Sequence, residues 1–202
     1  MKTSETRQYI IAIGSSAGGL EALSTFFDYT PLDNVSYIII SHMSSGFKSL
    51  MAELLVRHSK LEIFIAENDM EVKSNKVYVI PNTEYMTIRD GRLKLKEKKD
   101  KPGLERTIDT FFTSLAIERG DKAIGVILSG SLDDGKVGIE AIREAGGMVI
   151  VQDPTTAKFD GMPITAISTG CADWILPPKS MPSVIEKYVE QQLDQAVEIN
   201  HT

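Results

Sequence analysis

Short, continuously apolar runs alternate along the chain with longer stretches of helical periodicity. The first run, Tyr-Ile-Ile-Ala-Ile at 9–13, precedes a glycine-rich turn and a helical pattern that begins at Leu20. The same order recurs at 35–40 before 48–58, at 123–128 before 137–145, and at 148–152 before 162–167. Strands that are apolar at nearly every position are typical of parallel sheets covered by helices on both faces. The pattern therefore predicts a doubly wound α/β fold with a mostly parallel sheet.

One segment departs from this alternation. Residues 76–80 and 85–88 have strand-like composition, and Arg89-Asp90-Gly91 supplies a turn before 92–96, where basic residues alternate with leucine. Such alternation is typical of an edge strand with one solvated face. We therefore expect an antiparallel hairpin inserted into the parallel order, followed by an amphipathic helix at 106–118.

The length and composition fit a single domain. The chain has 202 residues, of which 42% are hydrophobic and 25% are charged, and this is enough to bury a sizeable core. We expect a polar N-terminal segment at 1–8, one domain at 9–190, and a polar C-terminal tail at 191–202 that frays beyond the last helix. A short strand is expected at 173–176, with Trp174 in the core.

The charge balance and the cysteine count exclude several classes of protein. With 28 acidic residues against 22 lysines and arginines, the net charge is -6, which offers no overall attraction to nucleic acid or an anionic bilayer. The single cysteine, Cys171, cannot close an internal disulfide or build a zinc site by itself. No apolar run approaches the roughly 20 residues that a membrane span needs. These features favour a cytoplasmic protein without nucleic-acid binding or direct membrane insertion.

The residues directly after the predicted strands are the first candidates for chemistry, because ligands gather beyond the carboxyl ends of parallel strands. Gly14-Ser15-Ser16-Ala17-Gly18 follows the first strand and fits the G-x-S-x-G nucleophile pattern. Ser16 stands at its centre, and the motif register favours it over Ser15. Small neighbours permit a sharp turn at a helix start, where the Ala17 N–H would stabilise an oxyanion. A phosphate-binding turn, or one that only packs tightly, remains an alternative.

A base and an acid are available at two further strand ends. Of three histidines, His42 alone follows a predicted strand, and imidazole has a pKa suited to deprotonating a serine. The strand ending at Leu128 is followed by Ser-Gly-Ser-Leu-Asp-Asp-Gly at 129–135, where a carboxylate would orient the imidazole. Taken separately, His42 fits a buried structural histidine and the Asp-Asp-Gly turn fits a helix cap. Their coincidence with Ser16 at one sheet edge favours a Ser-His-Asp triad.

These blocks resemble the catalytic domain of the chemotaxis protein-glutamate methylesterase family, CheB. The matching blocks stand in the family's order at 14–19, 41–43, 130–135, 152–153 and 161–163. The resemblance implies that Ser16 is the nucleophile, His42 the base and Asp134, rather than Asp133, the acid. It also implies that the second oxyanion amide, after that of Ala17, is the backbone N–H of Ser131.

Two features differ from the family's usual pattern. Leu132 stands where the family usually has glycine, and Ser131 stands where it commonly has Met or Thr. A Cβ disfavours positive φ, so Leu132 raises the question of whether the Ser131 amide keeps its place. The family's usual N-terminal receiver domain does not fit within 202 residues. The chain is therefore expected to be a stand-alone esterase or one piece of a fusion with a methyltransferase.

The resemblance implies hydrolysis of glutamate γ-methyl esters on the cytoplasmic domain of a methylated chemoreceptor. Deamidation of glutamine would use the same acyl chemistry, and neither reaction needs a metal or an organic cofactor. One rival is a receptor-binding or regulatory module of the same fold with little catalysis, which Leu132 motivates. A second rival is a small-molecule serine esterase, and phosphate or nucleotide binding at 14–19 is a weaker third. Arg106, which precedes a predicted helix, is expected at the surface.

Overall fold

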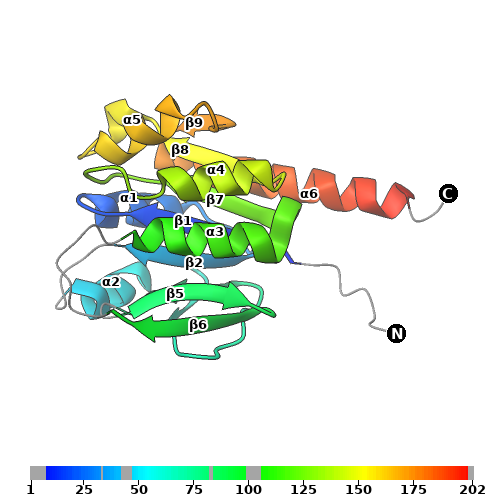
Figure 1. Ribbon diagram of the computed structural model, residues 1–202, viewed down its shortest axis with the longest axis horizontal. Helices are drawn as coiled ribbons and strands as arrows, with labels where there is room; N and C mark the ends of the chain where they lie inside the picture. Colours follow the sequence, from blue (N-terminus) through cyan, green and yellow to red (C-terminus); the bar gives the residue numbers. More distant parts are fainter. Residues whose placement is uncertain (1–7, 33, 42–46, 82–83, 99–105, 200–202) are drawn as a thin grey trace.

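A sheet of seven strands forms the centre of the computed structural model, which describes residues 8–32, 34–41, 47–81, 84–98 and 106–199 (Figure 1). In spatial order the strands are β3 (Glu62–Ile65), β4 (Lys76–Val79), β2 (Ser36–Ser41), β1 (Ile10–Ser15), β7 (Ala123–Ile127), β8 (Met148–Gln152) and β9 (Trp174–Leu176). All neighbouring pairs in this sheet are parallel. The arrangement confirms the predicted doubly wound fold.

Helices cover both faces of the sheet (Figure 1). One face carries α3 (Thr107–Arg119), α4 (Lys136–Glu144) and α5 (Gly161–Ser168), and the other carries α1 (Gly19–Asp28), α2 (Phe47–Leu55) and α6 (Met181–Ile199). Each face of the sheet has its own hydrophobic core, and successive residues of β1 point into them alternately. Ile10 packs with α3 and α4, whereas Ile11 packs with α1 and α6. Side chains alternate across a strand, so a sheet buried on both faces requires a continuous apolar run.

The expected hairpin forms a separate two-stranded sheet of β5 (Glu84–Arg89) and β6 (Arg92–Glu97). Its turn residues Asp90 and Gly91 have φ of 52° and 71°, the left-handed pair that a tight hairpin favours. Met86 and Leu93 are buried in the same core as α3. The hairpin therefore extends the layer of α3 instead of joining the central sheet.

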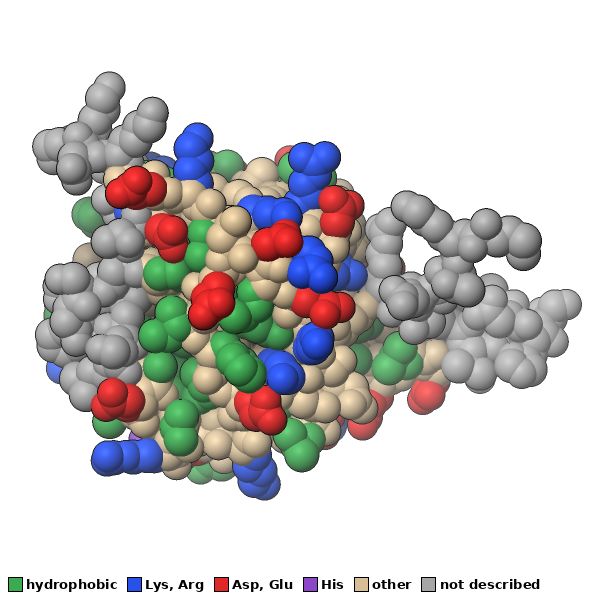
Figure 2. All heavy atoms as spheres, turned by 90° about the horizontal axis from the view of Figure 1, so that it is seen from below, with side chains coloured by type: hydrophobic (Ala, Val, Ile, Leu, Met, Phe, Trp, Pro, Cys, Tyr) green, Lys and Arg blue, Asp and Glu red, His purple; other side chains and the backbone are tan. Residues whose placement is uncertain are grey.

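The outer side of the hairpin carries charges of both signs. Figure 2 views the molecule from this side and shows acidic and basic side chains intermixed with apolar ones. Lys94 and Arg92 both pair with Asp69, from the segment before β4. The Leu93 N–H donates to the Met70 carbonyl oxygen at 2.8 Å. These contacts fasten the hairpin to the rest of the domain.

The structure differs from the sequence-based predictions at four elements. Residues 76–79, which the sequence grouped with the segment outside the parallel order, form β4, a strand that pairs in parallel with β2 and β3. The pattern did not predict β3, an edge strand whose Glu62 and Ile65 are exposed, so it lacks a continuous apolar run. Helix α6 continues to Ile199, where a polar tail from 191 was expected. The core position expected for Trp174 is wrong, because β9 is the other edge strand and the residue is 48% exposed. In the described ranges, no helix is both long and apolar enough to cross a membrane.

The close packing of α3 on α4 depends on Gly138. A Cβ built there would lie 2.5 Å from Phe112 Cβ and 3.2 Å from Asp109 Cα. We expect Gly138→Ala to lower the free energy of unfolding by about 1–2 kcal/mol, because overpacking outweighs the gain in helix propensity. Urea denaturation measures this change. The exposed neighbour gives the control Val137→Ala, expected within about 0.5 kcal/mol of wild type; equal stability of all three proteins would contradict the packing argument.

Candidate active site at the carboxyl edge of the sheet

After two neighbouring central strands, β1 and β7, the chain continues to opposite sides of the sheet. From β1 the chain proceeds to β2 on one side, and from β7 it proceeds to β8 on the other. Loops that diverge in this way form the usual ligand site of an open parallel sheet. The Ser16 N–H donates to the Ser129 carbonyl oxygen at 3.0 Å. The two loops that hold the candidate residues are therefore joined at one site.

The turn after β1 distinguishes the two candidate nucleophiles. Ser15 is fully buried, and its Oγ has no hydrogen-bond partner in the described part of the chain. Gly19 covers it, since a Cβ at that position would lie 2.6 Å from Ser15 Cβ. Ser16 is half-buried, and the chain then turns through Gly18, at φ 73°, into α1. This geometry favours Ser16 as the serine that a substrate reaches.

Two backbone amides belong to the loops that meet at Ser16. Neither the Ala17 N–H nor the Ser131 N–H has an acceptor among the described residues. The β7 loop lies directly against the nucleophile turn, because a Cβ at Gly130 would be 3.0 Å from Ser16 Cβ. Amides that are free to donate, next to a serine, are the donors that an oxyanion needs.

The loop after β7 takes a left-handed conformation at Leu132. Its φ is 70°, although a Cβ in this region costs roughly 1–2 kcal/mol. Gly161 lies close behind the loop, since a Cβ there would be 3.2 Å from the Leu132 nitrogen. The turn therefore forms with leucine in a conformation that glycine adopts freely, and the backbone of Leu132 is strained.

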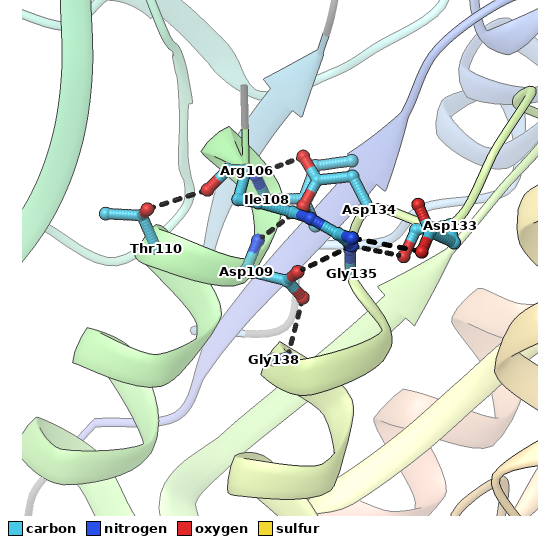
Figure 3. A network of polar contacts seen from close by, with 8 residues as sticks. All are labelled: Arg106, Ile108, Asp109, Thr110, Asp133, Asp134, Gly135 and Gly138. Atoms are coloured by element: carbon cyan, nitrogen blue, oxygen red, sulfur yellow. Dashed lines mark hydrogen bonds and ion pairs between the residues drawn. The ribbon is translucent and has the colours of Figure 1, made fainter. Parts of the chain in front are cut away.

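The Asp134 carboxylate lies at the N-terminus of α3, as Figure 3 shows. Its Oδ2 accepts from the Ile108 N–H at 2.9 Å. Its Oδ1 accepts from the N–H groups of Asp109 and Gly135, at 3.0 and 2.9 Å. The residue is buried, and a helix N-terminus favours negative charge. Asp134 precedes α4 in the chain, yet the helix that it caps is α3.

A second buried carboxylate caps the other helix of the pair. Asp109 lies in the first turn of α3, and its Oδ1 accepts from the Gly138 N–H of α4 at 2.8 Å. Burial raises the pKa of Asp109; the Gly138 hydrogen bond lowers it and the nearby negative charge of Asp134 raises it. Asp134, which precedes α4, thus caps α3, and Asp109 of α3 caps α4 (Figure 3). The pair joins α3 to α4 directly beneath the candidate site.

Arg106 supplies positive charge to this network. Its guanidinium donates to Asp133 Oδ2 at 3.0 Å and to the Asp133 carbonyl oxygen at 3.2 Å. It also lies 3.4 Å from Asp109 Oδ2. The sequence predicted a surface residue, and the side chain is partly exposed, but its guanidinium is engaged with these acidic residues instead of facing solvent alone.

His42, the predicted base, lies outside the described residues. The described chain reaches Ser41, the last residue of β2, which is in register with Ser15 of β1. Ser16, Ala17, Ser131 and Asp134 are all described. The contacts above bring Ser16 to the loop that holds Ser131 and Asp134.

A cavity of about 440 Å³ opens next to the nucleophile turn. Its walls are one side of α1, residues 155–158 and residues 177–179. Gly18 and Ser129 line it, whereas Ser16, Ala17 and Ser131 do not. The cavity therefore borders the nucleophile turn through Gly18 and the β7 loop through Ser129. Across the described ranges, no group of three His, Cys, Asp or Glu side chains is placed to hold a metal ion.

Sequence reasoning missed two residues that organise the site. The Ser129 Oγ donates to the Ala17 carbonyl oxygen at 2.9 Å and accepts from the Phe159 N–H at 3.0 Å. Its own amide donates to Gln152 Oε1 at 2.8 Å. Polar residues at the ends of apolar strands were the available signal for Ser129. Asp109 gave no such signal in the sequence, because acidic residues are common in the first turn of a helix.

Comparisons with known proteins give consistent matches. The CheB methylesterase family model matches residues 11–185. An uncharacterized 104.1 kDa protein of Rhodobacter capsulatus is 45% identical over 123 residues, which are 61% of this chain and 13% of that protein. Protein-glutamate methylesterase/protein-glutamine glutaminase 1 of Geobacter metallireducens is 31% identical over 202 residues, covering 98% of this chain and 56% of that protein. This chain thus spans about half, or less, of the length of these curated relatives.

A solved structure is also similar. The catalytic domain of Thermotoga maritima CheB methylesterase matches with a TM-score of 0.84 and 30% sequence identity. The match covers 91% of this chain and 100% of that domain. The resemblance noted from the sequence blocks is confirmed by the family model and by this structural match.

The buried carboxylate pair makes stability depend on pH in a defined direction. The pKa of Asp109 is raised in the folded protein, so the unfolded chain loses this proton at lower pH than the folded one. The contribution of Asp109 to folded-state stability therefore falls as pH rises above about 4 through the folded pKa. Asp109→Asn keeps an oxygen for the Gly138 amide and removes the charge. We expect its free energy of unfolding, relative to wild type, to increase across that interval.

Urea denaturation at several pH values between about 4 and 8 tests this expectation. Asp109→Ala is the matched control, because it leaves the buried Gly138 N–H without its acceptor. At low pH, where Asp109 of the wild type is protonated, we expect Asp109→Ala to be less stable than the wild type by about 1–3 kcal/mol. A pH-independent difference between Asp109→Asn and wild type would show that the carboxyl has an ordinary pKa.

Proposed function

Because the chain belongs to the CheB methylesterase family, we propose that it hydrolyses glutamate γ-methyl esters on the cytoplasmic domain of a chemoreceptor. The observation that carries the proposal is the junction of the β1 and β7 loops, where Ser16 donates its amide to Ser129. Relatives named protein-glutamate methylesterase/protein-glutamine glutaminase support the reaction class. The same acyl chemistry extends to deamidation of glutamine, with ammonia as the leaving group in place of methanol.

In the proposed reaction, Ser16 Oγ attacks the ester carbonyl carbon while His42 accepts the hydroxyl proton. The Ala17 and Ser131 amides stabilise the oxyanion that forms. His42 then gives the proton to the departing methoxide, which leaves as methanol and an acyl-enzyme. A water molecule, deprotonated by His42, attacks this ester, and Ser16 Oγ leaves with the proton. The products are methanol and a glutamate carboxylate.

Asp134 is proposed to orient His42 and to stabilise its charged form. Three backbone amides donate to this carboxylate. These amides hold the carboxylate against α3, which suits a group that fixes a tautomer. Ser41, the residue before His42, lies in register with Ser15. The position of His42 in the chain thus suits a base for Ser16.

The partial exposure of Ser16 is compatible with a macromolecular substrate. A side chain presented by another protein must reach the serine, and Ser16 is half-buried whereas Ser15 is fully buried. The proposal places the reaction in the cytoplasm, where the receptor's cytoplasmic domain lies. A fused or associated methyltransferase or receiver domain completes the proposed set of partners.

The nucleophile assignment predicts opposite results for two adjacent serines. Ser16→Ala should reduce methanol release from methylated receptor by at least about 10³-fold, because the attacking oxygen is removed. Ser15→Ala is the matched control. It removes a buried hydroxyl that has no hydrogen-bond partner in the described part of the chain, so activity should stay within about twofold of wild type. Circular dichroism confirms that both variants fold.

Each contrary outcome has a defined meaning. Full activity of Ser16→Ala would refute the triad, and a loss confined to Ser15→Ala would assign the nucleophile to the other serine. A folded wild-type protein that binds receptor but yields no methanol and no acyl-enzyme would favour the regulatory module. Rapid turnover of a small soluble ester, with indifference to receptor, would favour the small-molecule esterase.

A further inference from the structure

Leu132 combines two unfavourable features that the fold does not explain. Its φ of 70° is strained for a residue with a Cβ. Its side chain is 79% exposed, so packing within the domain does not offset the strain. Glycine reaches the same φ freely. Strain that persists at an active site is a sign of function, and here the feature to explain is an exposed leucine.

The position of Leu132 is at the rim of the proposed catalytic site. Ser131, the residue before it, supplies the proposed oxyanion amide. Gly130, one residue earlier, lies against Ser16, since a Cβ there would be 3.0 Å from Ser16 Cβ. Gly161 lies behind the Leu132 nitrogen. The exposed side chain thus belongs to the residue next to a group proposed to contact the reacting oxygen.

Phe159 contributes a second exposed apolar side chain at this rim. A Cβ at Gly18 would lie 3.2 Å from its Cδ2, so the ring borders the nucleophile turn. The residue is nevertheless 44% exposed. Its carbonyl oxygen accepts from the Gly130 N–H at 3.0 Å, and its N–H donates to Ser129 Oγ at 3.0 Å. Its backbone is therefore fixed to the same loop that presents Leu132.

We propose that Leu132, together with Phe159, determines specificity by packing on apolar side chains of the protein segment that carries the glutamate ester. The inference rests on the proposed function, because the occupant is the protein that presents its side chain to Ser16. Any such segment must pass over this rim when its ester reaches the Ser131 amide. A blocked single glutamate γ-methyl ester has no neighbouring residues to make the contact. Leu132 thus favours a protein substrate over a small ester.

Two substitutions separate the apolar contact from the backbone conformation. Leu132→Gly removes the side chain and relieves the strain, whereas Leu132→Asn keeps a Cβ, tolerates left-handed φ and presents a polar group. We expect neither variant to melt below wild type. The ratio of kcat/KM on methylated receptor to kcat/KM on the blocked small ester should fall roughly tenfold in both, as expected for the loss of a buried leucine contact. Phe159→Ala should lower the same ratio.

The matched control is Ile117→Asn. Ile117 is an aliphatic side chain that is 83% exposed, near the C-terminal end of α3. This variant should leave the ratio within about twofold of wild type, because α3 rises about 1.5 Å per residue away from the site. An affinity measurement adds a second readout. In a Ser16→Ala background, which does not consume the ester, Leu132→Asn should weaken binding of methylated receptor roughly tenfold.

The outcomes are distinguishable. Unchanged ratios and affinities in both Leu132 variants would overturn the proposal, as would a loss in Leu132→Gly alone, because apolar character would then be irrelevant. Equal losses on both substrates would also overturn it, since Leu132 would then act on the oxyanion loop. Failure of the proposed function appears earlier, as absent methanol release by wild type or as full activity of Ser16→Ala. Where wild type binds methylated receptor but releases no methanol, the affinity measurement still tests Leu132.

Discussion

Two buried carboxylates that cap each other's helices hold the carboxyl edge of this protein together. Asp134 accepts backbone N–H groups of α3, and Asp109 accepts one from α4. Buried charges are tolerated only where hydrogen bonds replace water, so both helix starts must stay where these bonds place them. Gly138 permits the close approach of α3 and α4 that this arrangement requires. These hydrogen bonds therefore fix the position of the loop from Ser129 to Gly135, which contains Asp134.

The parallel sheet decides where such a loop becomes useful. Because β1 and β7 are neighbours whose chains diverge, their loops meet at the middle of the carboxyl edge. Ser129 then links the two loops and residue Phe159 through its backbone and its hydroxyl. A buried scaffold of this kind holds amides and a serine in place. The result is a polar site whose candidate serine is partly exposed.

The rim of the site is as informative as its centre. Ser16 and the amides of Ala17 and Ser131 suit acyl chemistry in general, and they do not select a substrate. Leu132 and Phe159 add exposed apolar surface that the domain itself does not use. The proposed division, with chemistry on the fixed loops and recognition on the exposed side chains, would suit a substrate that is part of another folded protein.

The sequence by itself determined the features that are local. Continuous apolar runs predicted the buried parallel strands, Asp90-Gly91 predicted the hairpin turn, and blocks spread along the chain indicated the family. Tertiary structure decided what depends on distant segments: that Gly19 covers Ser15, that Asp134 caps a helix 26 residues earlier in the chain, and that β9 is an edge strand. The approach of His42 to Ser16 stays a prediction. The physical reason is that burial and hydrogen-bond partners form between segments far apart in the sequence, whereas periodicity reports only which faces of each segment are apolar.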